Sequence, residues 1–128
     1  MPKVIYSPRD GLVIETGSGF VLKDSPLREA QEVITVLSSG TATLKNYGIT
    51  SITTSGGASG VITLPDGANA GDLKTVVLTS DGGDATLSVS NHITTSPEVF
   101  TANAAADCIV FVWNGTKWAT VHNHSWTT

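Results

Sequence analysis

Short apolar runs separated by turn residues fill the chain from Glu32 onward. The runs EVITVLSS, GITSITTS, GVITL, LKTVVLTS, ATLSVS and PEVFTA are rich in β-branched residues or alternate apolar with polar side chains, and both patterns are typical of β-strands. Turn clusters such as PDGANAG and DGGD lie between them. We therefore predict seven to nine short strands, with LKTVVLTS and ATLSVS forming a hairpin, in an all-β antiparallel β-sandwich or jelly roll.

The strongest hairpin signal lies in segment 110–121, VFVWNGTKWATV, where Asn114 and Gly115 separate two apolar runs. A two-residue loop would place Phe111 opposite Trp118, whereas a four-residue loop would place Trp113 opposite Trp118. Both alternatives pair two aromatic rings across the strands, which contributes about 0.5 to 1 kcal/mol. We assign a structural role to the hairpin residues Phe111, Trp113, Asn114, Gly115 and Trp118.

The run DCIVFVW, which precedes this loop, is apolar on both faces of its predicted strand. A strand of this kind lies in the middle of a sandwich or at a subunit contact. We therefore expect self-association, with a trimer favoured over a dimer. The only cysteine, Cys108, lies in this run; it cannot form an intrachain disulfide, and we interpret it as a buried, unreactive thiol.

Residues 1–31 differ in composition from the β-rich part, residues 32–128. They hold three of the five prolines and four of the seven Lys and Arg residues. One interpretation is an edge strand or two with loops and a short helical turn at Ser25–Pro26; the other is an extended N-terminal arm that docks on a neighbouring subunit. In the second case the partner-binding residues are Val4, Ile5, Tyr6, Arg9, Leu12, Ile14, Phe20, Leu22 and Arg28.

The charge content of the chain excludes some classes of partner. Charged residues make up 14% of the chain, the formal net charge is −4 and the pI is about 5.1, so we expect no nucleic-acid partner. No apolar run reaches the roughly 18 residues of a membrane span, and the first residues lack the apolar core of a signal peptide. We therefore expect a soluble protein with no membrane partner.

The residues that carry chemistry do not form a recognisable catalytic or metal motif. The loops TGSG, TSGGASG and DGGD lack the ending of a phosphate loop. Asp81 and Asp84 are read as turn acids, and His122 and His124 as part of a polar tail, with a histidine ring on a symmetry axis as the alternative. We predict no enzymatic activity, no cofactor and no metal.

A longer segment resembles a known class of proteins. GVITLPDGANAGDLKTVVLTSDGGDATLSV, followed by ADCIVFVWNGTKWATV, resembles β-rich structural proteins of tailed-bacteriophage virions, including head decoration (cement) proteins and fibre-like modules. The shared features are a Pro-Asp-Gly turn after an apolar strand, a G-x-x-K step, and a Trp-bearing hairpin closed by Asn-Gly. They cover roughly residues 60–121. The resemblance implies a location on the virion surface and a trimeric or dimeric assembly.

Two functions follow from these observations. The first is a capsid decoration protein at the virion surface that binds and stabilises the major capsid shell. The second is a receptor- or carbohydrate-binding tip module of a tail appendage, in which exposed Trp113, Trp118 and Trp126 stack on sugar rings. The sequence shows no repeat and no coiled-coil heptad, which counts against a fibrous tail module.

Overall fold

The computed structural model describes residues 4–7, 11–14, 30–37, 39–57 and 60–128, and these residues are all-β. Within these ranges there is no helix; the helical turn predicted at Ser25–Pro26 lies outside them. The strands are β1 (Val4–Ser7), β2 (Gly11–Ile14), β3 (Gln31–Leu37), β4 (Thr41–Thr43), β5 (Gly48–Ser55), β6 (Gly60–Leu64), β7 (Leu73–Ser80), β8 (Ala85–Val89), β9 (Glu98–Ala102), β10 (Cys108–Trp113) and β11 (Trp118–His124).

The N-terminal strands β1 and β2 form a two-stranded antiparallel sheet of their own. Val4 lies opposite Ile14, and Tyr6 lies opposite Leu12. Five residues assigned to the docking arm are on these two strands: Val4, Ile5, Tyr6, Leu12 and Ile14. The other four, Arg9, Phe20, Leu22 and Arg28, lie outside the described residues.

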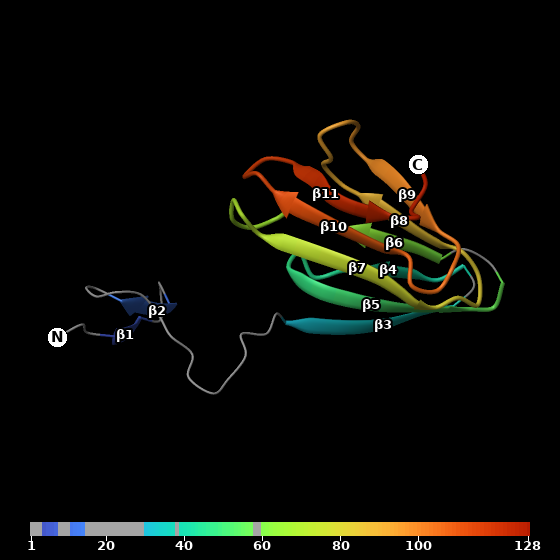
Figure 1. Ribbon diagram of the computed structural model, residues 1–128, viewed down its shortest axis with the longest axis horizontal. Coiled ribbons are helices and arrows are strands. Elements are labelled where there is room, and N and C mark those ends of the chain that lie inside the picture. The colour runs from blue at the N-terminus through green and yellow to red at the C-terminus, as the bar shows by residue number, and fades with distance from the viewer. Residues whose placement is uncertain (1–3, 8–10, 15–29, 38, 58–59) are drawn as a thin grey trace.

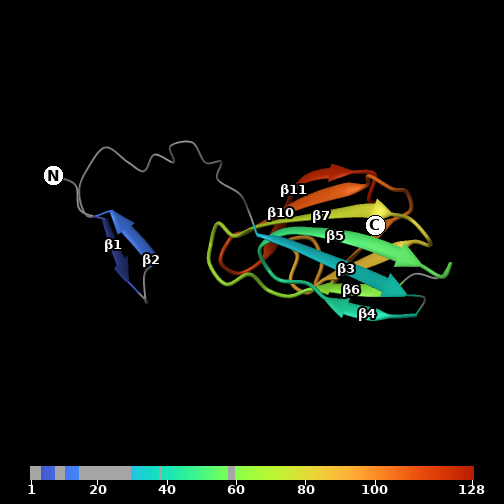
Figure 2. The same cartoon turned by 90° about the horizontal axis from the view of Figure 1, so that it is seen from below.

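From β3 to β8 the chain alternates between two larger sheets. Strands β3, β5 and β7 run parallel in a five-stranded sheet of order β11-β10-β7-β5-β3. Strands β4, β6 and β8 run parallel in a four-stranded sheet of order β4-β6-β8-β9. Each coil of the chain therefore consists of one strand from each sheet, and three such coils (β3 with β4, β5 with β6, β7 with β8) stack side by side (Figure 1, Figure 2). This is the chain course of a two-sheeted β-solenoid.

Three sequence predictions are wrong at this point. The sheets are mixed rather than antiparallel, because β3, β5 and β7 run parallel, as do β4, β6 and β8. The runs LKTVVLTS and ATLSVS do not form a hairpin: β7 pairs with β5 and β10, whereas β8 pairs with β6 and β9. The chain also contains a structural repeat, since Gln31 pairs with Ile49, 18 residues later, and Gly48 pairs with Lys74, 26 residues later.

The corners of successive coils stack so closely that glycine is required there. The Asp81–Asp84 turn does not reverse the chain within one sheet, because hydrogen bonds to Thr54 at the end of β5 hold it in place. The Gly82 amide donates to Thr54 Oγ1 at 3.1 Å, and that hydroxyl donates to the Gly83 carbonyl at 2.5 Å. A Cβ on Gly82 would lie 2.5 Å from the Thr54 carbonyl oxygen, and one on Gly60 would lie 2.0 Å from Val36 Cγ1. The turn therefore leads the chain across to the other sheet.

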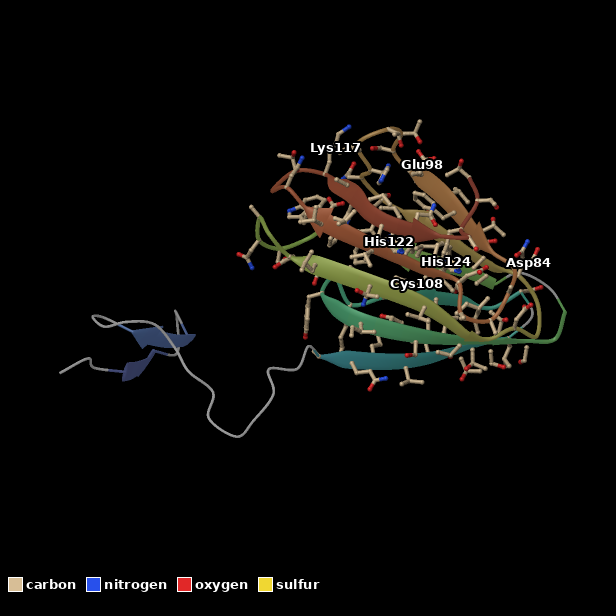
Figure 3. All side chains as sticks on the ribbon, viewed as in Figure 1. Asp84, Glu98, Cys108, Lys117, His122 and His124 are labelled. Atoms are coloured by element: carbon tan, nitrogen blue, oxygen red, sulfur yellow. The ribbon has the colours of Figure 1, made fainter. Side chains whose placement is uncertain are left out.

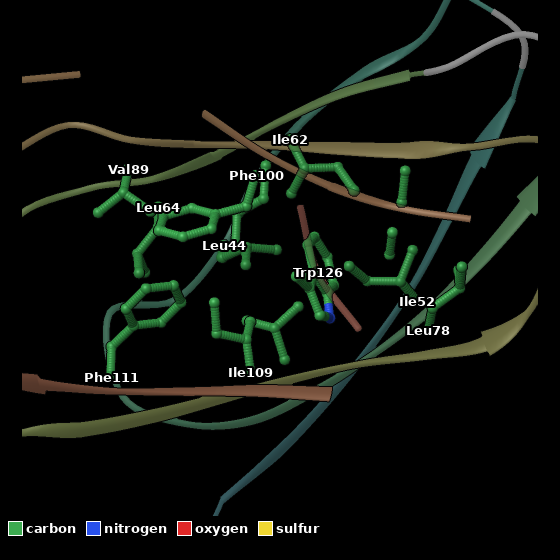
Figure 4. Close-up of a cluster of buried hydrophobic side chains, with 14 of the residues drawn as sticks. Leu44, Ile52, Ile62, Leu64, Leu78, Val89, Phe100, Ile109, Phe111 and Trp126 are labelled. Atoms are coloured by element: carbon green, nitrogen blue, oxygen red, sulfur yellow. The ribbon is translucent and has the colours of Figure 1, made fainter. Parts of the chain in front are cut away.

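The inward side chains of both sheets form one apolar cluster (Figure 4). They line up along the coil stack, as in the column Ala42, Ile62 and Leu87 of the four-stranded sheet. Ile62 and Leu87 are fully buried, whereas the first-coil residues Ala42 and Ile34 are only partly buried. The later coils are thus covered by strands on both sides, whereas the first coil is covered on one side only, by the second coil.

The last part of the chain closes the opposite end of the stack. Strands β9, β10 and β11 pair antiparallel with their neighbours. Beyond β11, Trp126 is buried in the core and Thr127 exchanges two backbone hydrogen bonds with Thr101 of β9, with N···O distances of 2.7 and 2.9 Å. This bridge ties the segment after edge strand β11 to edge strand β9. In the described part of the chain, the edges formed by β3 and β4 have no comparable bridge.

Candidate functional site

The closing hairpin has the four-residue loop of the two alternatives. Trp113 lies directly opposite Trp118, with ring centroids 5.2 Å apart. Asn114 organises the loop, because its Oδ1 accepts hydrogen bonds from the amides of Thr116 at 2.9 Å and Lys117 at 2.8 Å. Gly115 has a φ of 103°, which disfavours any side chain. The loop residues therefore fix the register of the two tryptophans.

All three tryptophans are buried, so the expectation that they are exposed for sugar stacking is wrong. The exposed fractions are 5% for Trp113, 0% for Trp118 and 4% for Trp126. The Trp118 Nε1 donates to the Pro65 carbonyl at 2.8 Å, which ties the hairpin to the turn after β6. Phe111, also fully buried, packs edge-on against Trp118. These aromatic side chains stabilise the core and are not available to a ligand.

The outer face of the five-stranded sheet is an extended surface without charged side chains of Lys, Arg, Asp or Glu. One row across the sheet joins His124, Cys108, Val77, Ser51 and Val33. We call this surface the outer face; its apolar members are Val33, Leu37, Ile49, Leu73, Val77, Cys108, Val110, Val112 and Ala119.

The two sheets differ in how apolar their exposed surfaces are. On the four-stranded sheet the outward positions are mostly Thr and Ser, with Val61 and Val99 as the apolar exceptions. On the outer face of the five-stranded sheet, Val33 is 69% exposed, Leu37 63% and Leu73 44%. The strand β10, predicted to be apolar on both faces, is an interior strand of this sheet, between β11 and β7. An uncharged, partly apolar sheet face of this extent is typical of a contact surface.

His122 and His124, interpreted from the sequence as part of a polar tail, instead lie on β11 and together on the outer face, next to Cys108 (Figure 3). His122 is opposite Val110 and His124 is opposite Cys108, and both histidines are exposed. Burial raises the pKa of the Cys108 thiol, which disfavours the reactive thiolate. Among the described residues no three His, Cys, Asp or Glu side chains gather closely enough to hold a metal ion.

A buried lysine links the three coils inside the molecule. Lys74 of β7 is fully buried, and its Nζ donates to Thr50 Oγ1 at 2.5 Å and to the Tyr47 carbonyl at 3.2 Å. Its charge partner is Glu32 of β3, whose Oε2 is 3.6 Å from Nζ. The Thr50 hydroxyl donates to the same Glu32 oxygen at 2.7 Å. Successive coils thus contribute a carboxylate, a hydroxyl and an ammonium group to one network.

The electrostatics of this network follow from burial and from its hydrogen bonds. Burial lowers the pKa of Lys74, and the charge of Glu32 opposes this change. Burial by itself would raise the pKa of Glu32, but hydrogen bonds from Thr50 and the Lys45 amide, together with the Lys74 charge, hold it below its ordinary value. Glu32 is therefore ionised at neutral pH, and its charge opposes the effect of burial on the pKa of Lys74.

A second polar network surrounds His92, which is 4% exposed. The Nε2 of His92 lies 3.0 Å from Thr120 Oγ1, and Nδ1 lies 2.7 Å from Thr94 Oγ1. The Thr94 hydroxyl donates to Glu98 Oε2 at 2.5 Å, and the Thr95 hydroxyl donates to the same oxygen. Because the Thr94 hydroxyl gives its only proton to Glu98, it faces His92 as an acceptor, while the Thr94 amide faces Nδ1 as a donor at 3.4 Å.

Burial lowers the pKa of His92, assisted by the positive charge of Lys117 and opposed by Glu98. Hydrogen bonds from Thr94 and Thr95 lower the pKa of Glu98. A pocket of about 380 Å³ opens beside this network. Its lining includes the polar residues His92, Thr94, Glu98, Thr120 and Asn123. Sequence reasoning missed this pocket, because the residues that line it come from separate segments of the chain.

The other sequence-level candidates have simple structural roles or none. Asp81 caps its turn by accepting a hydrogen bond from the Gly83 amide at 3.1 Å. The described part of the chain contains no helix that is long and apolar enough to cross a membrane. The chain matches no protein-family model and no curated protein.

Proposed function

We propose that this protein is a structural component of a bacteriophage virion, a capsid decoration protein that binds and stabilises the major capsid shell without catalysing a reaction. The observation that carries the proposal is the outer face of the five-stranded sheet. A broad uncharged surface with exposed Val33, Leu37 and Leu73 suits a permanent contact better than free exposure to water.

The N-terminal segment has a second part in this proposal. It holds four of the seven Lys and Arg residues and four of the eleven Asp and Glu residues, so it has no net charge, whereas residues 32–128 carry the whole net charge of −4. Its basic side chains can pair with acidic groups on a shell. Its apolar pieces on β1 and β2 add contact area. We propose that residues 1–31 clamp the neighbouring capsid subunit, that the two facing sheets act as a rigid β-sandwich, and that the protein acts as a homo-oligomer on the capsid surface.

The test is co-sedimentation with capsid shells of the phage that encodes the protein. Leu73→Lys places a charge on the outer face, and Val61→Lys places one on the outward side of the four-stranded sheet. The two residues are matched in exposure, at 44% and 45%. We expect Leu73→Lys to lose shell binding and Val61→Lys to bind like the parent, with both variants melting like the parent. Equal binding by both variants contradicts the proposal.

A second candidate function has one specific observation in its favour, the pocket beside His92. Glu98 and Asn123, which line it, are the kinds of groups that bind sugar hydroxyls. A receptor-binding tip module would use this pocket rather than the buried tryptophans. The test is titration with host surface glycans: saturable binding that disappears in Glu98→Gln supports this function, and absence of binding to the parent rejects it.

A further inference from the structure

We infer that two copies of this chain join edge to edge through β3, in antiparallel register, about a two-fold axis that lies between the two strands and beside Ile34 of each copy. The inference rests on the self-association included in the proposed function, and it specifies the surface and the number of subunits. The inferred contact is made by the backbone edge of β3, whereas the proposed shell contact is made by the side chains of the outer face.

The free edge of β3 carries unpaired backbone groups. The Ile49 amide donates to the Ala30 carbonyl at 2.9 Å, and the parallel ladder then directs the backbone groups of residues 30, 32, 34 and 36 toward β5. The N–H and C=O groups of Val33 and Thr35 consequently point away from the sheet. In the described residues no strand lies on that side.

This edge lacks the usual protection against pairing. Proteins guard edge strands with lysine, proline, bulges or very short length. Strand β3 has seven residues, no proline, no lysine, and a register with β5 that runs without a shift from Gln31 to Leu37. Its one charged residue, Glu32, is held inside by Lys74. Such a strand is a template for another strand.

A second copy of β3 can pair with this edge along its full length. With the axis at Ile34, all seven residues overlap, Val33 pairs with Thr35 of the partner subunit, and Gln31 pairs with Leu37 of the partner subunit. The hydrogen-bonded positions are then residues with free backbone groups in both copies. Outward residues meet outward residues, so the outer faces of the two copies become continuous.

The partial exposure of the core at the first coil also supports the pairing of two β3 edges. Ile34 and Ala42 in the first coil are only partly buried, although their counterparts in the later coils are fully buried. Strands β3 and β4 form the edges of the two sheets at the same end of the stack (Figure 2). An axis perpendicular to the sheets and beside Ile34 would therefore also bring the β4 edges of two copies toward each other. The two open ends cover one another, and the same contact surface occurs on both subunits, as in an isologous dimer.

The experiment combines sedimentation of the full chain with disulfide cross-linking in a Cys108→Ser background. At the axis the Cα atoms of Ile34 in the two copies lie about 4.5 Å apart in a non-hydrogen-bonded pair, within the range for a disulfide. Ile34→Cys should therefore form a covalent dimer on mild oxidation. Val33→Cys is the control: it is 69% exposed, but it faces Thr35 of the partner subunit rather than a second cysteine, so it should remain uncrosslinked.

A second pair of variants tests the backbone contact itself. Thr35→Pro removes only an N–H that points away from β5, so the fold should persist while the dimer becomes a monomer. Thr35→Val keeps this N–H and should remain a dimer.

Several results would overturn the inference. They are a parent that sediments as a monomer or a trimer, cross-linking of Val33→Cys equal to that of Ile34→Cys, and a folded Thr35→Pro that stays dimeric. None of these measurements involves capsid shells. A dimer that fails to bind shells therefore rejects the proposed shell contact alone. A shell-binding monomer leaves that contact standing and rejects the inference together with the self-association on which it rests.

Discussion

Removing the charge of Glu32 should destabilise the protein more than removing that of Lys74, although the lysine is the more deeply buried partner. The side chain of Lys74 is 0% exposed and that of Glu32 is 16% exposed. In Glu32→Gln the ammonium group remains in the interior with only the Thr50 hydroxyl and the Tyr47 carbonyl as acceptors. In Lys74→Met the carboxylate keeps hydrogen bonds from Thr50 and the Lys45 amide and reaches water.

The magnitudes follow from these environments. Loss of one partner of a buried ion pair costs about 3 to 5 kcal/mol when the other charge is left uncompensated. We expect Glu32→Gln to fall in that range and Lys74→Met to cost about 1 to 2 kcal/mol, close to the cost of a lost hydrogen bond to a charged group. The double variant removes the stranded charge, so it should be more stable than Glu32→Gln alone.

Urea unfolding of the four proteins measures these differences as changes in midpoint at constant m-value. The pH dependence adds an independent check. The folded pKa of Glu32 is lowered, so its contribution is present above the unfolded pKa of about 4.5 and is lost as the pH falls through the folded pKa. The reasoning is refuted if Lys74→Met is the more damaging single change, or if the two costs add in the double variant.

Four further predictions concern other parts of the molecule. Gly115→Val should cost about 1 to 2 kcal/mol, because its φ of 103° is unfavourable for a β-branched residue; an unchanged melt would contradict this reading of the loop. Trp118→Ala should cost about 3 to 5 kcal/mol in chemical denaturation, and a loss under 1 kcal/mol would show that the ring is not a core element. Because burial lowers the folded pKa of His92, stability should decline as the pH falls below about 6.5, and His92→Asn should flatten this part of the profile; identical profiles for the two proteins would count against the assignment. Deletion of residues 2–24 should leave a folded core, judged by its melt, with weakened shell binding, and a truncated protein that fails to fold would place that segment in the β-core.

The strand positions could be predicted from the sequence because burial leaves a direct mark on it. In β8, Ala85, Leu87 and Val89 alternate with polar residues, and all three are buried in the structure. The partners of each strand left no such mark. An alternating pattern indicates which side chains face the core but not which strand lies alongside, so β7 and β8 were paired through the nearest turn. The short strand β4 was missed because three residues, TAT, carry almost no pattern.

A signal for the coils was nevertheless present. Glycine-containing corners precede β4, β6 and β8 as SSG, GGASG and DGGD. Similar corners at intervals of about 20 residues indicate a stacked repeat. The charged interior was harder to predict, since Leu73 and Lys74 suggest an exposed lysine. In the structure Lys74 lies on the same face of β7 as the buried residues Val76 and Leu78. Its side chain therefore points into the core, and Leu73 points outward.

The pocket could not be predicted because its residues are brought together only by tertiary structure. Thr120 lies 28 residues after His92 and reaches it through a parallel bridge between His92 and Trp118. A lone histidine next to threonines gives no sequence pattern for such a network. The same holds for the outer face, since its uncharged character emerges only when five strands are placed in register.

The coil stack also has a consequence for how this protein can change its size in evolution. Parallel neighbours are spaced about 4.8 Å apart, so an inserted coil would lengthen the molecule by one such step without altering the closed end near Trp126. The corners at Gly60 and Gly82 tolerate no extra bulk, but the segment 65–72 on the opposite side already accounts for most of the difference between an 18-residue and a 26-residue repeat. A coil can therefore gain residues only on the side of segment 65–72, and each added coil lengthens the molecule by the same strand spacing.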